Sequence, residues 1–284
     1  MKLFRKRIRG EDVVLGRYAN ILVDDWFKRT FGEKHSKRLL QLFLQEVIPD
    51  RDIADISYAP QEHVNPFRRK KGIRVDVECT DSDGRRFVVE MQLAPQKFFY
   101  ERAVYNTSFA VQEQIPQGQQ TYDFPEVYFI GVMNFALHRG GRVRYSYTIR
   151  EEVTDELMTD RVKYIFLELP NSVPLWQRAE ASVLDKFCYA MYMMPSLTDR
   201  PAELEAEIFK LLFDFAEIAN FAPRERIKYI NDMTTKRDLH NQIEYARDEG
   251  REQGREEAMK IIAQNMQDMG MSMEDIKKAT GVSL

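Results

Sequence analysis

The sequence predicts an α/β protein with a mixed central sheet flanked by helices and an all-helical C-terminal region. Residues 75–93 alternate apolar and polar side chains around an Asp-Ser-Asp-Gly turn, which predicts a β-hairpin. Residues 127–135 form a nearly continuous apolar run, typical of a strand buried on both faces. After Pro195 the apolar spacing is helical. A hairpin, a helix and then a buried strand indicate a mixed sheet covered by helices.

The segments before the hairpin are expected to be helical and then extended. Apolar residues between positions 24 and 47 recur at spacings of three and four, which predicts a helix. Pro49 ends this pattern because a proline ring cannot continue a helix. A short strand is expected at residues 53–58.

The segments after the hairpin begin with a helix from Pro95 to about Ile115. Its apolar side is expected to carry Phe98, Tyr105 and Phe109. Three further elements follow the buried strand: strands at 144–153 and 163–169, and a helix at 174–194 that Pro174 opens.

The C-terminal region reads as a series of helices, expected at 203–221, at 224–233 and from 236 onward. Gly250 and Gly254 should weaken the last of these, because glycine is a poor helix former. Ser272 with Asp275 forms a capping box, and Gly281 is placed to end the final helix.

A break at Gly270 leaves two short helices that have some likeness to a helix-turn-helix. A helical packing or oligomerisation tail is the favoured alternative, because no basic residues except Lys277 and Lys278 mark a recognition surface. The chain therefore divides into a basic N-terminal arm at 1–20, an α/β domain at 21–195 and a helical region at 196–284, through which a homo-oligomer could form.

The composition supports a folded protein without a membrane span. Hydrophobic residues make up 44% of the chain, enough for a buried core. The longest apolar stretch, 127–137, is far shorter than the roughly 20 residues that a membrane helix needs. No apolar run of signal-peptide length follows the basic N-terminus. The two cysteines, Cys79 and Cys188, lie far apart and form neither a disulfide framework nor a metal cluster, so the cytoplasm is the expected compartment.

A net charge of -3 argues against a protein that coats nucleic acid through its overall field, but it permits a local basic surface. Basic residues gather at two places, and such runs are usually solvated surface. These residues are Lys2, Arg5, Lys6, Arg7 and Arg9, and then Arg68, Arg69, Lys70 and Lys71. The second group precedes the hairpin and could contact phosphates there.

The hairpin carries the one organised group of candidate functional residues. Asp76 lies on the first strand and Glu90 and Gln92 on the second, and pairing through the turn can bring the two acids to one face. Two adjacent carboxylates repel each other unless one is protonated or a cation bridges them. Oxygen ligands favour a hard cation such as Mg²⁺. The alternative is a solvated hairpin face with scattered acids.

The order of these residues resembles a known signature. An acid, a turn and then Glu90-Met91-Gln92 resembles the PD-(D/E)XK nuclease pattern, and more narrowly the Rpn family of recombination-promoting nucleases, also described as PD-(D/E)XK family transposases. The matching residues are Asp24-Asp25-Trp26-Phe27-Lys28 with Phe31-Gly32, Val75-Asp76-Val77, Gly84, Val89-Glu90-Met91-Gln92, Arg102 and Tyr105, and the Glu-Gly-Arg-Glu repeat of the tail.

The resemblance implies a restriction-endonuclease-like fold and Mg²⁺-dependent DNA cleavage linked to recombination or mobile elements. It makes Asp76 and Glu90 the metal ligands and Asp24 a possible additional one. Gln92 stands where most of these enzymes carry lysine, so it cannot supply a positive charge to the transition state. Val75 replaces the proline of the signature, which contributes no chemistry.

Other polar residues have a functional and a structural interpretation. Arg102 could reach a DNA phosphate or pair with acids on an exposed helix. Glu78 could hold a second metal, but a solvated position beside the strand end is favoured. The four histidines lack the paired spacing of a zinc or nucleophile site and are expected to be ordinary surface or capping residues: His35, His63, His138 and His240.

The functional hypothesis is a Mg²⁺-dependent DNA endonuclease in which Asp76 and Glu90 hold the metal and Gln92 positions the attacking water. A catalytically silent, nuclease-like DNA-binding or assembly protein is the first alternative. Transposase-type strand transfer is the second, because it uses the same metal site with a DNA 3′ hydroxyl in place of water.

Overall fold

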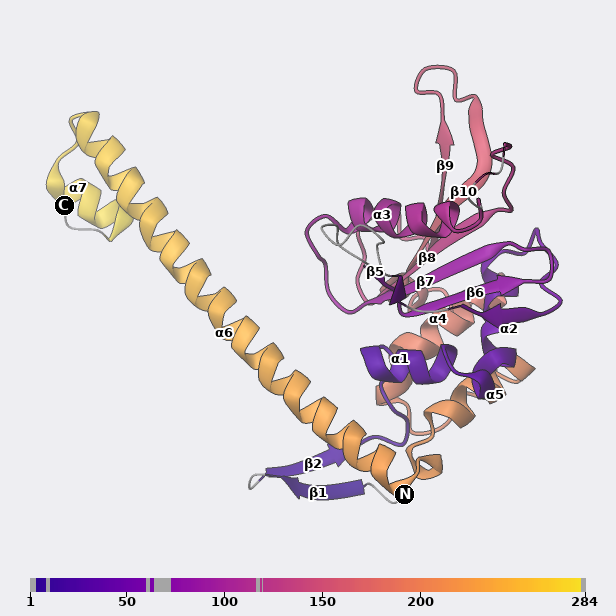
Figure 1. Cartoon of the computed structure of the whole chain (residues 1–284). Coiled ribbons are helices and arrows are strands. Elements are labelled where there is room, and N and C mark those ends of the chain that lie inside the picture. The colour runs from indigo at the N-terminus through magenta and orange to yellow at the C-terminus, as the bar shows by residue number, and fades with distance from the viewer. Residues whose placement is uncertain are drawn as a thin grey trace. The chain divides into compact units, whose positions relative to one another are not determined.

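A six-stranded mixed sheet forms the centre of the chain (Figure 1). The computed structural model describes residues 4–8, 11–59, 62–63, 73–115, 118 and 120–281. The strands, in spatial order, are β3 (Ile56–Tyr58), β6 (Val77–Asp81), β7 (Arg86–Gln92), β8 (Val127–Met133), β10 (Leu157–Glu168) and β9 (Arg144–Arg150). β7, β8 and β10 run parallel, and the other neighbours are antiparallel. The predicted hairpin and mixed sheet are confirmed.

Helices cover both faces of this sheet, as Figure 1 shows. The helices on the larger core are α1 (Asp24–Phe31), α2 (Lys37–Val47), α4 (Val183–Met193) and α5 (Glu207–Ala216). The single helix α3 (Phe99–Gln112) packs on the opposite face over a smaller core. Successive side chains of a strand point to opposite faces of the sheet. Val77 and Val89 therefore point into the larger core, whereas Val88 points toward α3.

The register of the parallel strands aligns their carboxyl ends in one row. Gln92 on β7 pairs with Met133 on β8, and Met133 pairs with Glu168 on β10. Two residues earlier, Glu90 lies opposite Gly131. Polar residues that follow or end these strands are thereby brought to the same edge, where open α/β sheets commonly bind ligands.

Short elements complete the chain. Two small sheets were not expected from the sequence: β1 (Phe4–Ile8) with β2 (Glu11–Leu15), and β4 (Glu62–His63) with β5 (Ile73–Arg74). The 3-10 turns are η1 (Lys34–Ser36), η2 (Leu169–Ser172), η3 (Met194–Ser196) and η4 (Ile218–Asn220).

Several of the predicted helices begin or divide differently. The pattern at 24–47 is split into α1 and α2, because Gly32 and η1 interrupt it. The helix expected from Pro174 begins only at Val183. Its start is fixed by a capping box, in which the Ser182 hydroxyl accepts the Asp185 N–H at 3.0 Å and Asp185 accepts the Ser182 N–H.

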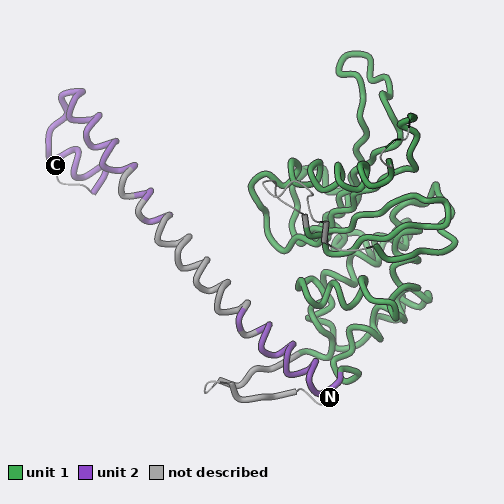
Figure 2. The backbone as a smooth tube through the Cα atoms, viewed as in Figure 1, with its two compact units in different colours: residues 1–6, 14–221 green, residues 7–13, 222–284 purple. Residues whose placement is uncertain are grey.

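The chain forms two compact units, residues 1–6 with 14–221 and residues 7–13 with 222–284 (Figure 2). The sequence placed the end of the α/β domain at 195, but the first unit continues to Phe221. The cause is α5, whose buried Ile208, Leu212 and Phe213 pack into the larger core.

The second unit contains α6 (Pro223–Asp268) and α7 (Met273–Thr280). α6 is continuous for 46 residues, about 69 Å, so the expected separation near 233–236 is wrong. The break at Gly270 and the ends of α7 are confirmed: Ser272 accepts the Asp275 N–H, and Gly281 adopts φ +72°. Oligomerisation through these helices stays a prediction. Among the described helices, none is both long and apolar enough to cross a bilayer.

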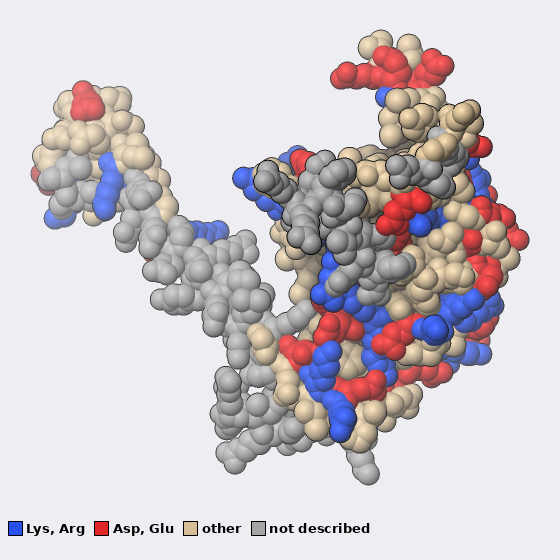
Figure 3. Space-filling view, in the orientation of Figure 1, with Lys and Arg blue, Asp and Glu red and all other residues tan. Residues whose placement is uncertain are grey.

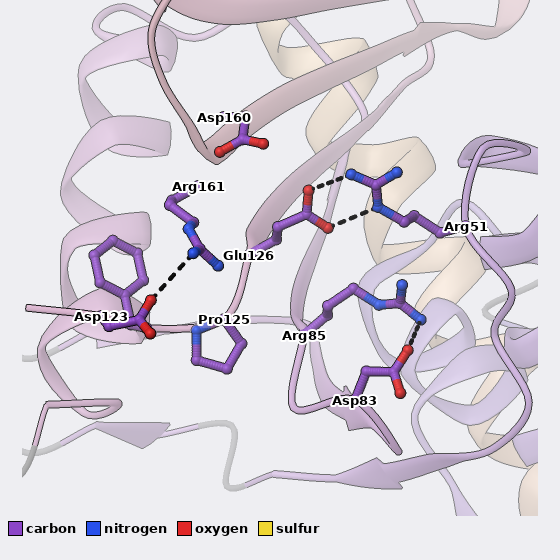
Figure 4. A pocket seen from close by; sticks show the side chains of 9 residues that line it. Arg51, Asp83, Arg85, Asp123, Pro125, Glu126, Asp160 and Arg161 are labelled. Atoms are coloured by element: carbon purple, nitrogen blue, oxygen red, sulfur yellow. Dashed lines mark hydrogen bonds and ion pairs between the residues drawn. The ribbon is translucent and has the colours of Figure 1, made fainter.

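A closed network of charges lies at the amino ends of the parallel strands. Glu126, just before β8, accepts two bonds from Arg51 at 2.6 and 2.9 Å and one from Lys163 at 3.0 Å. The bonds from Arg51 lower the pKa of Glu126 to about 2, with help from Lys163 and the Tyr128 hydroxyl against the cost of burial. A cavity of about 460 Å³ lies beside this network, and arginines pair most of its acids (Figure 4).

Replacing Gly131 with alanine should destabilise the first unit by about 1–3 kcal/mol. An added Cβ would lie 2.8 Å from Phe166 Cδ1 and 3.2 Å from Phe99 Cζ, so buried rings must shift. Both tryptophans belong to the first unit, so their fluorescence during urea unfolding reports on it. Gly254→Ala is the control, because nothing lies within 4 Å of its new Cβ. A Gly131→Ala variant as stable as wild type would contradict this packing.

Glu126→Gln should cost about 2 kcal/mol at pH 7, because it removes the charge that Arg51 and Lys163 bind. The folded pKa of about 2 lies below the ordinary value of 4.5. The wild-type stabilisation is therefore present above pH 4.5 and is lost as the pH falls through about 2. Urea unfolding at pH 7 and pH 3 should show the two proteins converging in acid. The exposed Glu152→Gln variant should behave as wild type throughout.

Candidate metal centre at the carboxyl end of the sheet

Asp76 lies where the β6–β7 ladder ends. The last ladder pair is Val77 with Val89, and beyond it the two strands separate. The Asp76 Oδ2 atom accepts the Met91 N–H at 2.8 Å, so a side chain takes the place of the next backbone partner. This bond fixes the Asp76 carboxylate next to Glu90, which lies one residue before Met91 on β7.

Glu90 is almost fully buried, with 4% of its surface exposed, on the side of β7 that faces α3. Its Oε1 accepts the Asn106 side-chain amide at 3.2 Å, and its Oε2 lies 3.7 Å from Arg102 Nη2. Burial, and then the negative charge of Asp76, raise the pKa of Glu90 to about 8, although Arg102 and Lys28 oppose the shift. The structure therefore brings Asp76 and Glu90 close enough for each charge to act on the other.

Lys28 on α1 is a member of this cluster that the sequence reasoning did not single out. Its Nζ lies 3.4 Å from Asp76 Oδ1 and 3.1 Å from Asp24 Oδ1. Burial lowers the pKa of Lys28, but the hydrogen bond with Asp24 and the charge of Asp76 outweigh it and raise the pKa overall. Lys28 is thus a charged ammonium with 16% of its side chain exposed. The i, i+4 spacing from Asp24 was the signal in the sequence that could have found it.

Gln92 presents an unsatisfied acceptor beside the two acids. The residue is 6% exposed, and its Oε1 is buried without a hydrogen-bond partner. A buried carbonyl oxygen left unpaired costs free energy, so it favours a cation or a donor placed against it. Two carboxylates and an amide oxygen form a hard donor set, which fits Mg²⁺ completed by water.

The centre offers few acidic side chains as metal ligands. Within the described ranges, no group of three or more acid, histidine or cysteine side chains is arranged to hold a metal ion. Protein ligands to a cation here would be Asp76 and Glu90, and the unpartnered Gln92 oxygen could accept a hydrogen bond from a water that the cation holds. Asp24, expected as an additional ligand, has a 59% exposed side chain that bonds Lys28, and its role as a ligand stays a prediction.

The remaining predicted site residues are placed less centrally. Arg102 on α3 is 43% exposed and contacts both Glu90 and the Gln96 side chain. The predicted solvated position of Glu78 is wrong. It is 1% exposed and lies 3.3 Å from Arg86 Nη1, because its strand position turns it toward the α3 side. Arg68, Arg69, Lys70 and Lys71, predicted to bind DNA, lie outside the described residues.

The chain was compared with protein families, curated proteins and solved structures. The model of the PD-(D/E)XK nuclease family transposases matches residues 21–246, more than half of the chain. No curated protein and no solved structure matches. The matched range contains the mixed sheet, its flanking helices and the whole Asp76 cluster. This chain belongs to the PD-(D/E)XK nuclease family transposases.

Proposed function

We propose that this protein is a Mg²⁺-dependent endonuclease that hydrolyses DNA phosphodiesters, in a role linked to recombination or mobile elements. Membership of the nuclease family supports the reaction class. The observation that carries the proposal is the placement of the buried Glu90, the partly buried Asp76 and the unpartnered amide oxygen of Gln92 at one end of the β6–β7 hairpin.

Asp76 and Glu90 are proposed as the residues that hold the cation. A bound divalent cation would supply stabilisation of the charge that builds on phosphorus and would lower the pKa of a coordinated water. The chain fixes its own donors beforehand: the Met91 N–H holds Asp76, and the Asn106 amide holds Glu90. Such preorganisation removes the cost of orienting these groups during the reaction. The Gln92 oxygen is proposed to orient the attacking water by accepting a hydrogen bond from it.

Lys28 is proposed to supply the positive charge that Gln92 cannot. In the sequence signature the lysine stands on the same strand as the second acid, and here that position holds a neutral amide. The Lys28 ammonium approaches Asp76 from α1 at 3.4 Å and is one of the cations that act on Glu90. We assign it to a non-bridging phosphate oxygen in the transition state.

The surroundings of the site suit a nucleic acid. Arg102 lies half-exposed beside Glu90 and is proposed to contact a phosphate. We keep the cytoplasm as the proposed compartment, because Cys79 and Cys188 are both buried free thiols. A homo-oligomer through α6 and α7 is also proposed, since a double-strand cut is favoured by two sites.

Two alternatives share this site. A silent, nuclease-like assembly protein would bind DNA without cutting it. The retained carboxylates, each held by a dedicated hydrogen bond, favour activity over degeneration. Strand transfer would use the same residues but join a DNA 3′ hydroxyl to the target, so its products are joined strands where hydrolysis leaves nicked ones.

Plasmid cleavage with Mg²⁺ should fall at least about 100-fold in Asp76→Asn and in Glu90→Gln. Both substitutions keep size and hydrogen-bonding ability but remove a charge that attracts the cation. Wild type treated with a chelator should be equally inactive, and the exposed Asp160→Asn variant should cut normally. Calorimetric titration with Mg²⁺ provides the second readout. Equal nicking by wild type and Asp76→Asn would remove Asp76 from the mechanism, and cation binding without nicking would favour the silent alternative.

Lys28→Met should lower the turnover number by about 100-fold while leaving Mg²⁺ binding in place, because it removes a charge from the transition state but no oxygen ligand. Lys28→Arg should recover part of the activity. Lys34→Met, on the exposed turn η1, is the matched control and should retain full turnover. A turnover number unchanged in Lys28→Met would show that the ammonium serves only to pair Asp24.

A further inference from the structure

Three exposed aromatic residues, here called the aromatic patch, lie on the first unit: Phe98, Tyr100 and Tyr147. Their exposed fractions are 60, 43 and 39%. The rings of Tyr100 and Tyr147 are 6.4 Å apart, and both stand edge-on against the buried ring of Phe166, at 5.2 and 5.6 Å. Phe166 therefore fixes the two tyrosines while part of each ring stays exposed.

The aromatic patch shares a sheet face with the candidate metal centre. Glu90 pairs with Gly131, and Gly131 pairs with Phe166, so all three point to the α3 side. Two strand spacings separate Glu90 from Phe166, about 10 Å. That is the length of about three stacked nucleotides.

A buried acid holds Tyr147 in position. Glu168 is completely buried, and its carboxylate accepts the N–H groups of Leu137 and His138, the His138 ring at 2.6 Å and the Asn171 amide at 2.7 Å. The other ring nitrogen of His138 is bonded to the Tyr147 hydroxyl. His138, with 25% of its side chain exposed, thus links the buried Glu168 to Tyr147. A buried carboxylate is costly, and the candidate metal centre makes no use of this one.

Phe98 adds a second unusual feature. Its φ of +63° lies in the left-handed region, which bulky side chains rarely adopt. The sequence predicted an apolar, inward position for Phe98, but α3 begins one residue later and leaves the ring exposed. The Lys97 ammonium lies 4.9 Å from the centre of this ring, so a cation accompanies the exposed aromatic surface.

We propose that the aromatic patch stacks on unpaired nucleobases, so that DNA with a single-stranded stretch is the substrate class of the neighbouring site. Ring faces bind bases of any sequence, but paired bases inside a duplex are already stacked on each other. Burial, and then the Tyr147 hydroxyl, raise the pKa of Tyr100 to about 12, so it is a neutral stacking partner and no phenolate nucleophile.

Charged side chains near the aromatic patch limit the path that a bound DNA strand can take. Lys97 lies over the Phe98 ring, and Arg102, which contacts Glu90, lies one helical turn after Phe98. Both can contact the phosphates of a bound DNA strand. The tip of the β9–β10 hairpin is acidic and would repel them, as Figure 3 shows; its exposed acids are Glu151, Glu152, Asp155 and Glu156. These charges direct a bound DNA strand toward Glu90 and away from the tip of the β9–β10 hairpin.

The test is fluorescence anisotropy of the full chain with labelled oligo(dT) and with a duplex of equal length, both in chelator. Wild type should prefer the single strand. Tyr100→Ala and Tyr147→Ala should each weaken oligo(dT) binding about tenfold, because stacking on one ring is lost. Tyr100→Phe should bind normally, because it keeps the ring. Tyr122→Ala is the matched control, since Tyr122 is 83% exposed outside the aromatic patch.

This inference rests on the proposed function for its substrate but is tested separately from it. Binding is measured without metal, so failure of Mg²⁺-dependent cleavage does not affect the result. Equal affinity of wild type for both DNAs, or unchanged oligo(dT) binding in both alanine variants, would overturn the proposal. Loss of binding in Tyr100→Ala that Tyr100→Phe does not share supports it, since the phenylalanine variant keeps the ring and loses only the hydroxyl.

Discussion

The candidate centre depends on one hydrogen bond at the point where β6 and β7 separate. An antiparallel ladder that ends leaves a backbone donor unpaired, and here the Asp76 carboxylate accepts that donor from Met91. The same bond places a negative charge beside Glu90, which is itself buried. The Asp76 side chain therefore has two effects: it pairs the backbone donor of Met91, and it places a second acid next to Glu90. Charge repulsion between those acids is the force that a cation would relieve.

The pKa values of the buried acids at the two ends of the sheet are shifted in opposite directions. At the amino end, Arg51 and Lys163 bind Glu126 so completely that its pKa falls to about 2. At the carboxyl end, desolvation and Asp76 raise the pKa of Glu90 to about 8. A satisfied acid stabilises the fold and has little capacity left for a ligand. A destabilised one is the sign of a functional site, because folding alone gives no reason to keep it.

Positive charge enters the centre from separate elements. Lys28 comes from α1 below the hairpin, and Arg102 comes from α3 on the other face of the sheet. Gln92 holds the strand position that usually carries the cation in this family's wider signature, and its oxygen is left without a partner. At this position of β7 the neutral Gln92 replaces the lysine of the signature, and the nearby positive charge is that of Lys28 on α1. Such an exchange is possible because a charge acts through space, whatever element carries it.

The sequence by itself determined the hairpin and the position of its acids. Alternation has a period of two, and Gly84 adopts the φ of +80° that its turn requires, so both signals are local. Tertiary structure decided which groups surround those acids. Lys28 and the buried pairing of Glu168 with His138 depend on how segments far apart in the chain pack against the sheet. Composition and spacing within one segment carry no information on such packing, because contact between distant segments is set by the whole core.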